Sequence, residues 1–177
     1  MRQLLLIVDP QVDFITGSLP VPGAESAMNR LAEYITGNNG LYAHKIITAD
    51  RHPYNHVSFM ENGGRWPRHC MHDTVGAAIW QPVFDAVYQT EGDVSILYKG
   101  QKSDTEEYSI FKNMESAKAI DRLIKEYGIE QIDLCGLAGD VCVSDTLNDG
   151  IKLYGNRFFN VLTEFSPSIF DGKSIIN

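Results

Sequence analysis

The chain has 177 residues, of which 44% are hydrophobic and 21% are charged, and its net charge at pH 7 is −8. This composition is typical of a globular protein and excludes a disordered or fibrous chain. The negative charge argues against nucleic acid held on a basic surface, and no apolar run reaches the ~18 residues of a membrane span.

The chain opens with the apolar run 4–8, which is too short for a secretory leader and is followed at once by Asp9 and Pro10. We therefore interpret it as a buried strand. The three cysteines, Cys70, Cys135 and Cys142, form no CxxC pair and are odd in number. This pattern predicts a reducing, cytoplasmic setting with at least one free thiol.

Further strands and helices are predicted to alternate along the chain. Short runs rich in apolar residues stand at 4–8, 45–48, 94–98, 132–134 and 158–162, as in strands buried on both faces of a parallel sheet. Helical spacing runs from Ala24 to Ile35, ended by Gly37, and from Ile120 to Tyr127, followed by Gly128. The alternation predicts an α/β fold, a three-layer sandwich around a mostly parallel sheet.

The sequence shows no internal repeat, low-complexity tract or linker. We therefore expect a single domain over residues 1–177. The stretch from about 52 to 90 is rich in Gly, Pro, His and Trp and lacks a long periodic pattern. It is predicted to be an inserted loop with one helix.

Reactive side chains stand at the ends of four predicted strands. Asp9 follows the first strand, Asp50 the second and Lys99 the third, while a Gly-rich turn, 136–139, and then Cys142 follow the fourth. Ligands of open parallel sheets bind beyond the carboxyl ends of the strands. The four strands therefore point to one site at one edge of the sheet.

Cys142 is the candidate nucleophile. Most free cysteines are small buried apolar residues, and we assign Cys135, inside a strand, to the core; Cys70 has no assigned role. Cys142 instead falls in the first turn of a predicted helix, where free N–H groups and the helix dipole favour a thiolate and can bind an oxyanion. Asp9 would take the thiol proton and later return it, and Lys99 would keep that carboxylate charged.

Asp50 and His52 are two residues apart, so on an extended chain their side chains face the same way. With His69 as a third ligand, they predict a site for one divalent metal, zinc first, with manganese or iron as alternatives. His56 is a candidate for an extra ligand or a supporting role, whereas His44 and His72 are interpreted as structural. Loop histidines in ordinary hydrogen bonds remain the alternative.

In this order, the motifs resemble the nicotinamidases and pyrazinamidases of the isochorismatase-like cysteine hydrolase superfamily. The matching segments cover nearly the whole chain: VDPQVDF (8–14), DRHPYNHVSF (50–59), WPRHC (66–70), KG (99–100), EYSIF (107–111) and GLAGDVCVSDT (136–146).

The resemblance implies an amidohydrolase that converts nicotinamide to nicotinate and ammonia through a cysteine thioester. It implies a catalytic triad of Asp9, Lys99 and Cys142 and a metal on the three ligands above, which would orient the pyridine nitrogen of the substrate. It further implies that Phe14 and Trp66 flank the aromatic ring. A cis peptide before Ala138 would bring the amides of Ala138 and Cys142 together as an oxyanion hole.

Two features depart from the family pattern. Gly139 stands where such proteins commonly carry Thr, and the tail after Leu162 lacks the usual closing amphipathic helix. The implied partner is a small-molecule amide, with no membrane or nucleic acid, and a homo-oligomer remains open. The alternatives are another amide or carbamoyl hydrolase of the superfamily, and a non-catalytic metal- or ligand-binding member.

Overall fold

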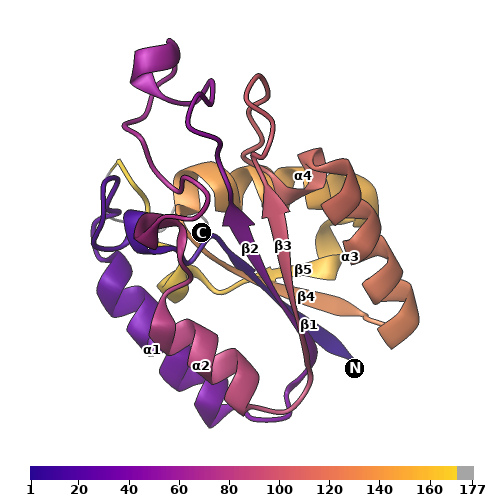
Figure 1. Cartoon of the computed structure of the whole chain (residues 1–177). Coiled ribbons are helices and arrows are strands. Elements are labelled where there is room, and N and C mark those ends of the chain that lie inside the picture. Colours follow the sequence, from indigo (N-terminus) through magenta and orange to yellow (C-terminus); the bar gives the residue numbers. More distant parts are fainter. Residues whose placement is uncertain (171–177) are drawn as a thin grey trace.

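The computed structural model describes residues 1–170. Its centre is a five-stranded sheet in the order β3-β2-β1-β4-β5 (Figure 1), in which every neighbouring pair is parallel. The strands are β1 (Gln3–Val8), β2 (Tyr42–Asp50), β3 (Asp93–Lys99), β4 (Gln131–Gly136) and β5 (Phe159–Val161). The predicted parallel sheet is confirmed, with the first four strands longer than their apolar runs and β5 shorter.

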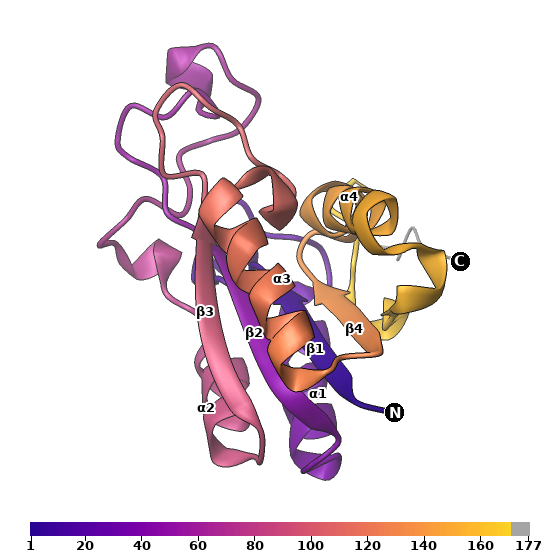
Figure 2. The ribbon, with the colours of Figure 1, turned by 90° about the vertical axis from the view of Figure 1, so that its right-hand side faces the viewer.

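Helices cover both faces of the sheet, which confirms the three-layer prediction (Figures 1 and 2). The helices α1 (Ala24–Gly37) and α2 (Gln81–Gln89) lie together on one face, and α3 (Met114–Tyr127) and α4 (Ser144–Tyr154) lie on the other. Among the helices of residues 1–170, none has both the length and the apolar character required to cross a membrane.

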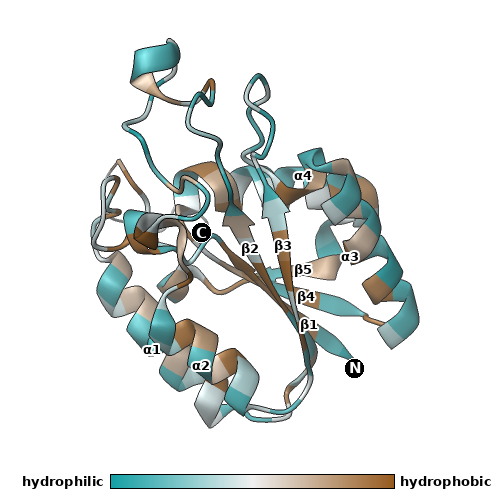
Figure 3. Cartoon of the chain, viewed as in Figure 1, coloured by the Kyte–Doolittle hydropathy of each residue, from teal (hydrophilic) through white to brown (hydrophobic). Residues whose placement is uncertain are grey.

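The strand β1 is apolar at consecutive positions because each of its faces meets a separate core. Leu5 and Ile7 belong to the cluster under α1 and α2, whereas Leu4 and Leu6 belong to the cluster under α3. All four are fully buried, and burying each such side chain contributes about 1.5–3 kcal/mol. Figure 3 shows the apolar strands between helices whose outer faces are polar.

The helix ends follow from local chemistry. Asn113 begins α3 by accepting a hydrogen bond from the Ser116 amide, and Gly128 ends it at φ 60°, a left-handed conformation that glycine adopts without steric cost. Gly37 is the last residue of α1 and Asn38 follows as its cap, so the glycine that was expected to stop this helix lies inside its end.

The connections after β2 and β3 rise above the carboxyl ends of these strands (Figure 1). The stretch between Asp50 and β3 contains α2 and short 3₁₀ turns. At the other end of the described chain, a single 3₁₀ turn (Thr163–Phe165) follows β5. The expectation that the tail lacks a closing helix falls in part on residues 171–177, which lie outside the described residues.

Candidate active site

Asp9 leaves the end of β1 in a conformation that directs its carboxylate into the protein. Its φ of 45° is unusual for a residue other than glycine. The Asp9 amide donates to the Thr48 carbonyl on β2 at 3.1 Å, and the Thr48 hydroxyl donates to Asp9 Oδ1 at 2.7 Å. Since Oδ1 is occupied, Oδ2 is the oxygen that faces the other reactive groups.

Lys99 lies between two carboxylates. Its Nζ is 2.8 Å from Asp9 Oδ2 and 2.7 Å from Asp50 Oδ1, and the lysine is completely buried. Among the described residues, Asp9 Oδ2 accepts no hydrogen bond of good geometry, so its contact with Lys99 is an ion pair. Burial opposes the charge, but the carboxylates of Asp50 and Asp9 raise the pKa of the Lys99 ammonium well above its ordinary value. Lys99 is therefore charged at neutral pH.

Cys142 lies in a π-helical turn (Gly139–Val143) between β4 and α4, where a regular first helical turn was expected. Such turns frequently occur at functional sites. Lys99 Nζ donates to Cys142 Sγ at 3.6 Å. The sulfur and one carboxylate oxygen each of Asp9 and Asp50 all lie within 4.8 Å of one another. The structure thus brings Asp9, Lys99 and Cys142 together.

The start of a helix was expected to favour a Cys142 thiolate, but the surroundings of the sulfur oppose that charge. Burial raises the pKa of the Cys142 thiol well above its ordinary value, although Lys99 acts in the opposite direction. Burial also raises the pKa of the Asp9 carboxyl, again against Lys99. A buried thiol flanked by carboxylates keeps its proton, so a base must remove that proton before the sulfur can attack.

The main chain before Cys142 has the geometry that the family resemblance implied. The peptide bond between Leu137 and Ala138 is cis. The Ala138 carbonyl accepts hydrogen bonds from the amides of Val141 and Val143, both at 3.1 Å. The Ala138 N–H has no hydrogen-bond partner within residues 1–170, so it is available to a ligand beside the sulfur.

The three predicted metal ligands also meet. Ligand atoms of Asp50, His52 and His69 lie within 4.8 Å of one another, and all three residues are buried. Asp50 Oδ2 is 3.7 Å from His52 Nε2. Their positions follow from the topology. Asp50 is the last residue of β2, His52 comes two residues later, and the loop that follows brings His69 back to the end of the strand.

The tautomers of both histidines suit a metal. His52 Nδ1 lies 2.8 Å from the Gly100 carbonyl, and His69 Nδ1 lies 2.7 Å from the Pro67 carbonyl. Since a carbonyl only accepts, each Nδ1 carries the hydrogen and each Nε2 keeps its lone pair. Burial lowers the pKa of His52 to about 4, so its ring is neutral at pH 7. One carboxylate and two imidazole Nε2 atoms are ligands that fit a divalent metal.

His56 is not a member of this set. Its ring stacks on His52 with centroids 3.9 Å apart. Its Nε2 faces the Thr105 carbonyl at 3.0 Å, and its Nδ1 accepts from the Ser58 amide at 3.1 Å. Because both ring nitrogens are occupied, His56 supports His52 by packing and has no free lone pair for a metal.

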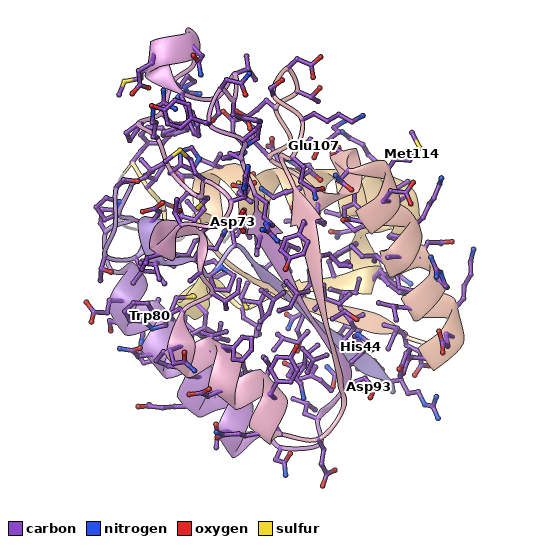
Figure 4. All side chains as sticks on the ribbon, in the orientation of Figure 1. His44, Asp73, Trp80, Asp93, Glu107 and Met114 are labelled. Atoms are coloured by element: carbon purple, nitrogen blue, oxygen red, sulfur yellow. The ribbon has the colours of Figure 1, made fainter. Side chains whose placement is uncertain are left out.

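The remaining two histidines make ordinary structural contacts. His44 lies near the start of β2 (Figure 4), where it binds Ser95 Oγ at 2.9 Å and packs on Tyr127. His72 is exposed and pairs with Asp73.

A narrow pocket opens onto Cys142. Together with its opening to solvent the pocket spans about 360 Å³, and its free interior is narrow. The lining residues are Phe14, Leu19, Asp50, Trp66, His69, Glu106, Tyr108, Ala138, Val141, Cys142 and Ile169. A wider hollow beside Arg51 and Tyr98 contains none of the predicted site residues.

The predicted aromatic residues line this pocket from two loops. Phe14 lies 5.4 Å from the His69 ring, centroid to centroid. Trp66 donates from Nε1 to the Tyr108 hydroxyl at 3.1 Å, which fixes the plane of the indole. Asp9, Lys99 and His52 do not line the pocket and lie behind its wall, fully or almost fully buried.

Sequence reasoning missed the residues that hold this arrangement. Asp13 Oδ2 accepts from the Cys70 amide at 2.7 Å, next to His69, and Asp13 Oδ1 accepts from the Ser18 amide at 3.1 Å. A Cβ on Gly76 would lie 2.0 Å from Asp13 Oδ2, so three loops meet at this carboxylate. Asp13 lies inside the motif VDPQVDF, but spacing alone does not reveal contacts between distant loops.

Glu107 was missed for the same reason. It lies beyond the carboxyl end of β3 (Figure 4), where Oε2 accepts from the Gly100 amide at 2.8 Å and from Asn113 Nδ2 at 3.1 Å. The Gly100 carbonyl in turn accepts from His52. Glu107 therefore holds Gly100, the residue whose carbonyl orients the candidate metal ligand His52.

Comparison with known proteins gives consistent matches. The family profile described as "Isochorismatase domain" matches residues 3–155. The nicotinamidase/pyrazinamidase of Mycobacterium tuberculosis is 31% identical, over 84% of this chain and 78% of that protein. The pyrazinamidase of Pyrococcus horikoshii, solved in complex with zinc, is 32% identical, with a TM-score of 0.78 over 96% of this chain and 88% of that one. PnC1 of L. infantum, solved with nicotinate, is 29% identical, with a TM-score of 0.81 over 96% and 83% of the two chains.

Proposed function

The chain belongs to the isochorismatase family, and from this premise we propose that it hydrolyses nicotinamide to nicotinate and ammonia. The observation that carries the proposal is the buried group of Cys142 Sγ, Lys99 Nζ and the Asp9 carboxylate behind a narrow aromatic pocket. Relatives with nicotinamidase activity in their names support the choice of substrate.

In the first half of the reaction, Asp9 removes the proton of the Cys142 thiol. The sulfur forms a bond to the carboxamide carbon, and the carbonyl electrons move to the oxygen. The amides of Ala138 and Cys142 stabilise this oxyanion, a contribution of about 3 kcal/mol per donor in well-studied hydrolases. Asp9 then gives its proton to the nitrogen, the C–N bond breaks, and ammonia leaves a thioester behind.

In the second half, Asp9 acts again as the base. It takes a proton from water, whose oxygen attacks the thioester carbon, and the sulfur leaves and recovers a proton. Lys99 holds Asp9 in place through the 2.8 Å ion pair, and its positive charge stabilises the negative charge that develops beside it. The product is nicotinate.

The carboxylate of Asp50 and the Nε2 atoms of His52 and His69 would hold a divalent metal. When bound, this ion would serve as a template that orients the substrate through its pyridine nitrogen. We propose zinc, because carboxylate and imidazole ligands suit it and the pyrazinamidase of P. horikoshii was solved with zinc. Manganese and iron accept the same ligands.

Phe14 and Trp66 are proposed to flank the pyridine ring. Both are largely buried and line the pocket that contains Cys142. Flat aromatic walls favour a planar ring by stacking and exclude water from the reacting atoms. Phe14→Ala or Trp66→Ala should therefore raise KM more than it lowers kcat.

The decisive experiment is ammonia release from nicotinamide by the purified protein, with its metal removed by a chelator and then restored as zinc, manganese or iron. We expect turnover that depends on the metal and is restored by at least one of these ions. A parallel panel of linear amides and carbamoyl compounds tests the alternative of another hydrolase of the family. Turnover of a panel member with none of nicotinamide would overturn the proposal, and no turnover at all would favour a binding protein.

A further inference from the structure

The two departures from the family pattern, Gly139 and the short tail, lie against each other. The Gly139 amide donates to the Pro167 carbonyl at 2.9 Å. A Cβ on Gly139 would lie 2.2 Å from the Ser166 carbonyl oxygen, which is a main-chain atom and cannot rotate away. The tail therefore occupies the space that a side chain at position 139 would need.

The neighbouring residue, Asp140, holds the next part of the tail. Its Oδ1 accepts from the Ile169 amide at 2.8 Å, and its Oδ2 accepts from the Phe170 amide at 3.2 Å. Gly139 and Asp140 belong to the same π-helical turn as Cys142. The turn that carries the sulfur and the segment 166–170 are thus joined by three hydrogen bonds.

This attachment brings the tail to the pocket. Ile169 lines the pocket together with Cys142 and Trp66. The Phe170 ring lies 6.2 Å from the Trp66 ring, centroid to centroid, and the Arg65 guanidinium lies 5.1 Å from the Trp66 centroid and 6.0 Å from that of Phe170. The tail therefore contacts Trp66 as well as contributing a side chain to the cavity.

We propose that residues 166–170 form a fixed wall of the pocket and that Ile169 sets the upper limit on the size of ring that the protein accepts. The inference rests on the proposed function and deepens it to a substrate class, amides on a small unsubstituted aromatic ring. The pocket is narrow and Ile169 lies on its wall, so a shorter or longer side chain at this position changes the space left for a substrate ring. One methylene in an apolar pocket changes selectivity by roughly 10- to 200-fold.

The test compares kcat/KM for nicotinamide and for 5-methylnicotinamide, a ring larger by one methyl group. We expect Ile169→Ala to raise the ratio of kcat/KM for 5-methylnicotinamide to kcat/KM for nicotinamide by about tenfold or more. Ile169→Phe should lower kcat/KM for both substrates. Ile151→Ala on α4, the same truncation outside the pocket lining, should leave the ratio unchanged. A variant that is merely less stable lowers both rates equally, so an unchanged ratio in Ile169→Ala overturns the assignment.

A second measurement does not depend on the substrate. Hydrogen exchange of the Ile169 and Phe170 amides in the full chain should be slow, and Asp140→Ala should accelerate it at both positions, while Asp104→Ala in an exposed loop should not. Unchanged exchange in Asp140→Ala overturns the anchored wall. If the wild-type protein releases no ammonia from nicotinamide but shows this exchange pattern, the proposed function fails and the anchored wall stands.

Discussion

Gln11 binds the main chain of Asp50 at both of its polar groups. The Gln11 Oε1 accepts from the Asp50 amide and Nε2 donates to the Asp50 carbonyl, both at 2.8 Å, and Nε2 also donates to the Ala77 carbonyl at 3.0 Å. The last main-chain contact from β1 to β2 is that of the Asp9 amide with the Thr48 carbonyl, and the glutamine side chain supplies the next contacts along β2. It thereby fixes a residue that contacts Lys99 and belongs to the candidate metal site.

Gln11→Ala should therefore weaken metal binding and stability together. Each buried main-chain group left without a partner costs about 1–3 kcal/mol, and loss of an outer contact to a metal ligand typically lowers metal affinity about 10- to 100-fold. Urea unfolding of the metal-free protein and titration with zinc measure the two effects. Gln101→Ala, at an exposed position, is the control, and zinc affinity equal to that of the control would contradict the role of Gln11.

Cys142→Ala should lower ammonia release from nicotinamide by about four orders of magnitude or more, because the sulfur forms the covalent bond. Binding of nicotinate, followed by calorimetry, should persist because the aromatic walls and the metal ligands remain. Cys135→Ala, a cysteine of the core, serves as the control and should keep turnover within an order of magnitude. Substantial turnover by Cys142→Ala would exclude the thioester scheme.

The pH dependence of kcat/KM should report Asp9. Burial raises the pKa of Asp9 above its ordinary value of 3.8, so its carboxylate form, the base, is lost as the pH falls through a value higher than 3.8. We expect an acidic limb above pH 3.8 in the wild type, and a much lower rate without this limb in Asp9→Asn. Metal content is measured at each pH, because loss of the metal would also lower the rate. A rate that stays constant down to pH 3.8 would contradict the prediction.

Removal of individual histidines separates the metal ligands from their neighbour. His52→Ala and His69→Ala should each lower the metal content measured by elemental analysis and raise KM for nicotinamide, because each removes a free Nε2 lone pair. His56→Asn can still donate and accept hydrogen bonds and should keep a metal-to-protein ratio near that of the wild type. Equal metal loss in His56→Asn and His52→Ala would show that His56 is a ligand.

Lys99→Met should destabilise the metal-free protein by about 3–5 kcal/mol, the typical effect of leaving buried carboxylates without their partner. Asp9 and Asp50 would then face each other without a cation between them. Urea unfolding at neutral pH measures the change, with Lys102→Met at an exposed position as the control. A stability equal to that of the control would contradict the prediction, because it would mean that the two carboxylates need no cation between them.

The sequence predicts the sheet and the site residues at its edge for one physical reason. Strands buried on both faces need apolar residues at every position, and a polar residue such as Asp9 or Lys99 therefore marks where burial between helices ends. Since the strands are parallel, these ends meet at one edge. The meeting of Asp9, Lys99 and Cys142, and that of Asp50 with two histidines, follow from this rule.

The remaining features depend on contacts that a linear pattern does not contain. The π-helical turn at Cys142 looks like an ordinary helix start in the sequence, and the pKa of its thiol is raised by burial beside carboxylates. Ile169 enters the pocket because Gly139 leaves space for the tail. Such relationships join residues about 30 to 60 positions apart and appear only in three dimensions.

The carboxylate of Asp50 serves two neighbours at once, with Oδ1 on the Lys99 ammonium and Oδ2 toward His52. Loss of Asp50 would therefore remove a candidate metal ligand and one of the two counter-charges of Lys99 in the same step. Loss of His52 or His69 would remove a candidate ligand and leave both ion pairs of Lys99 in place.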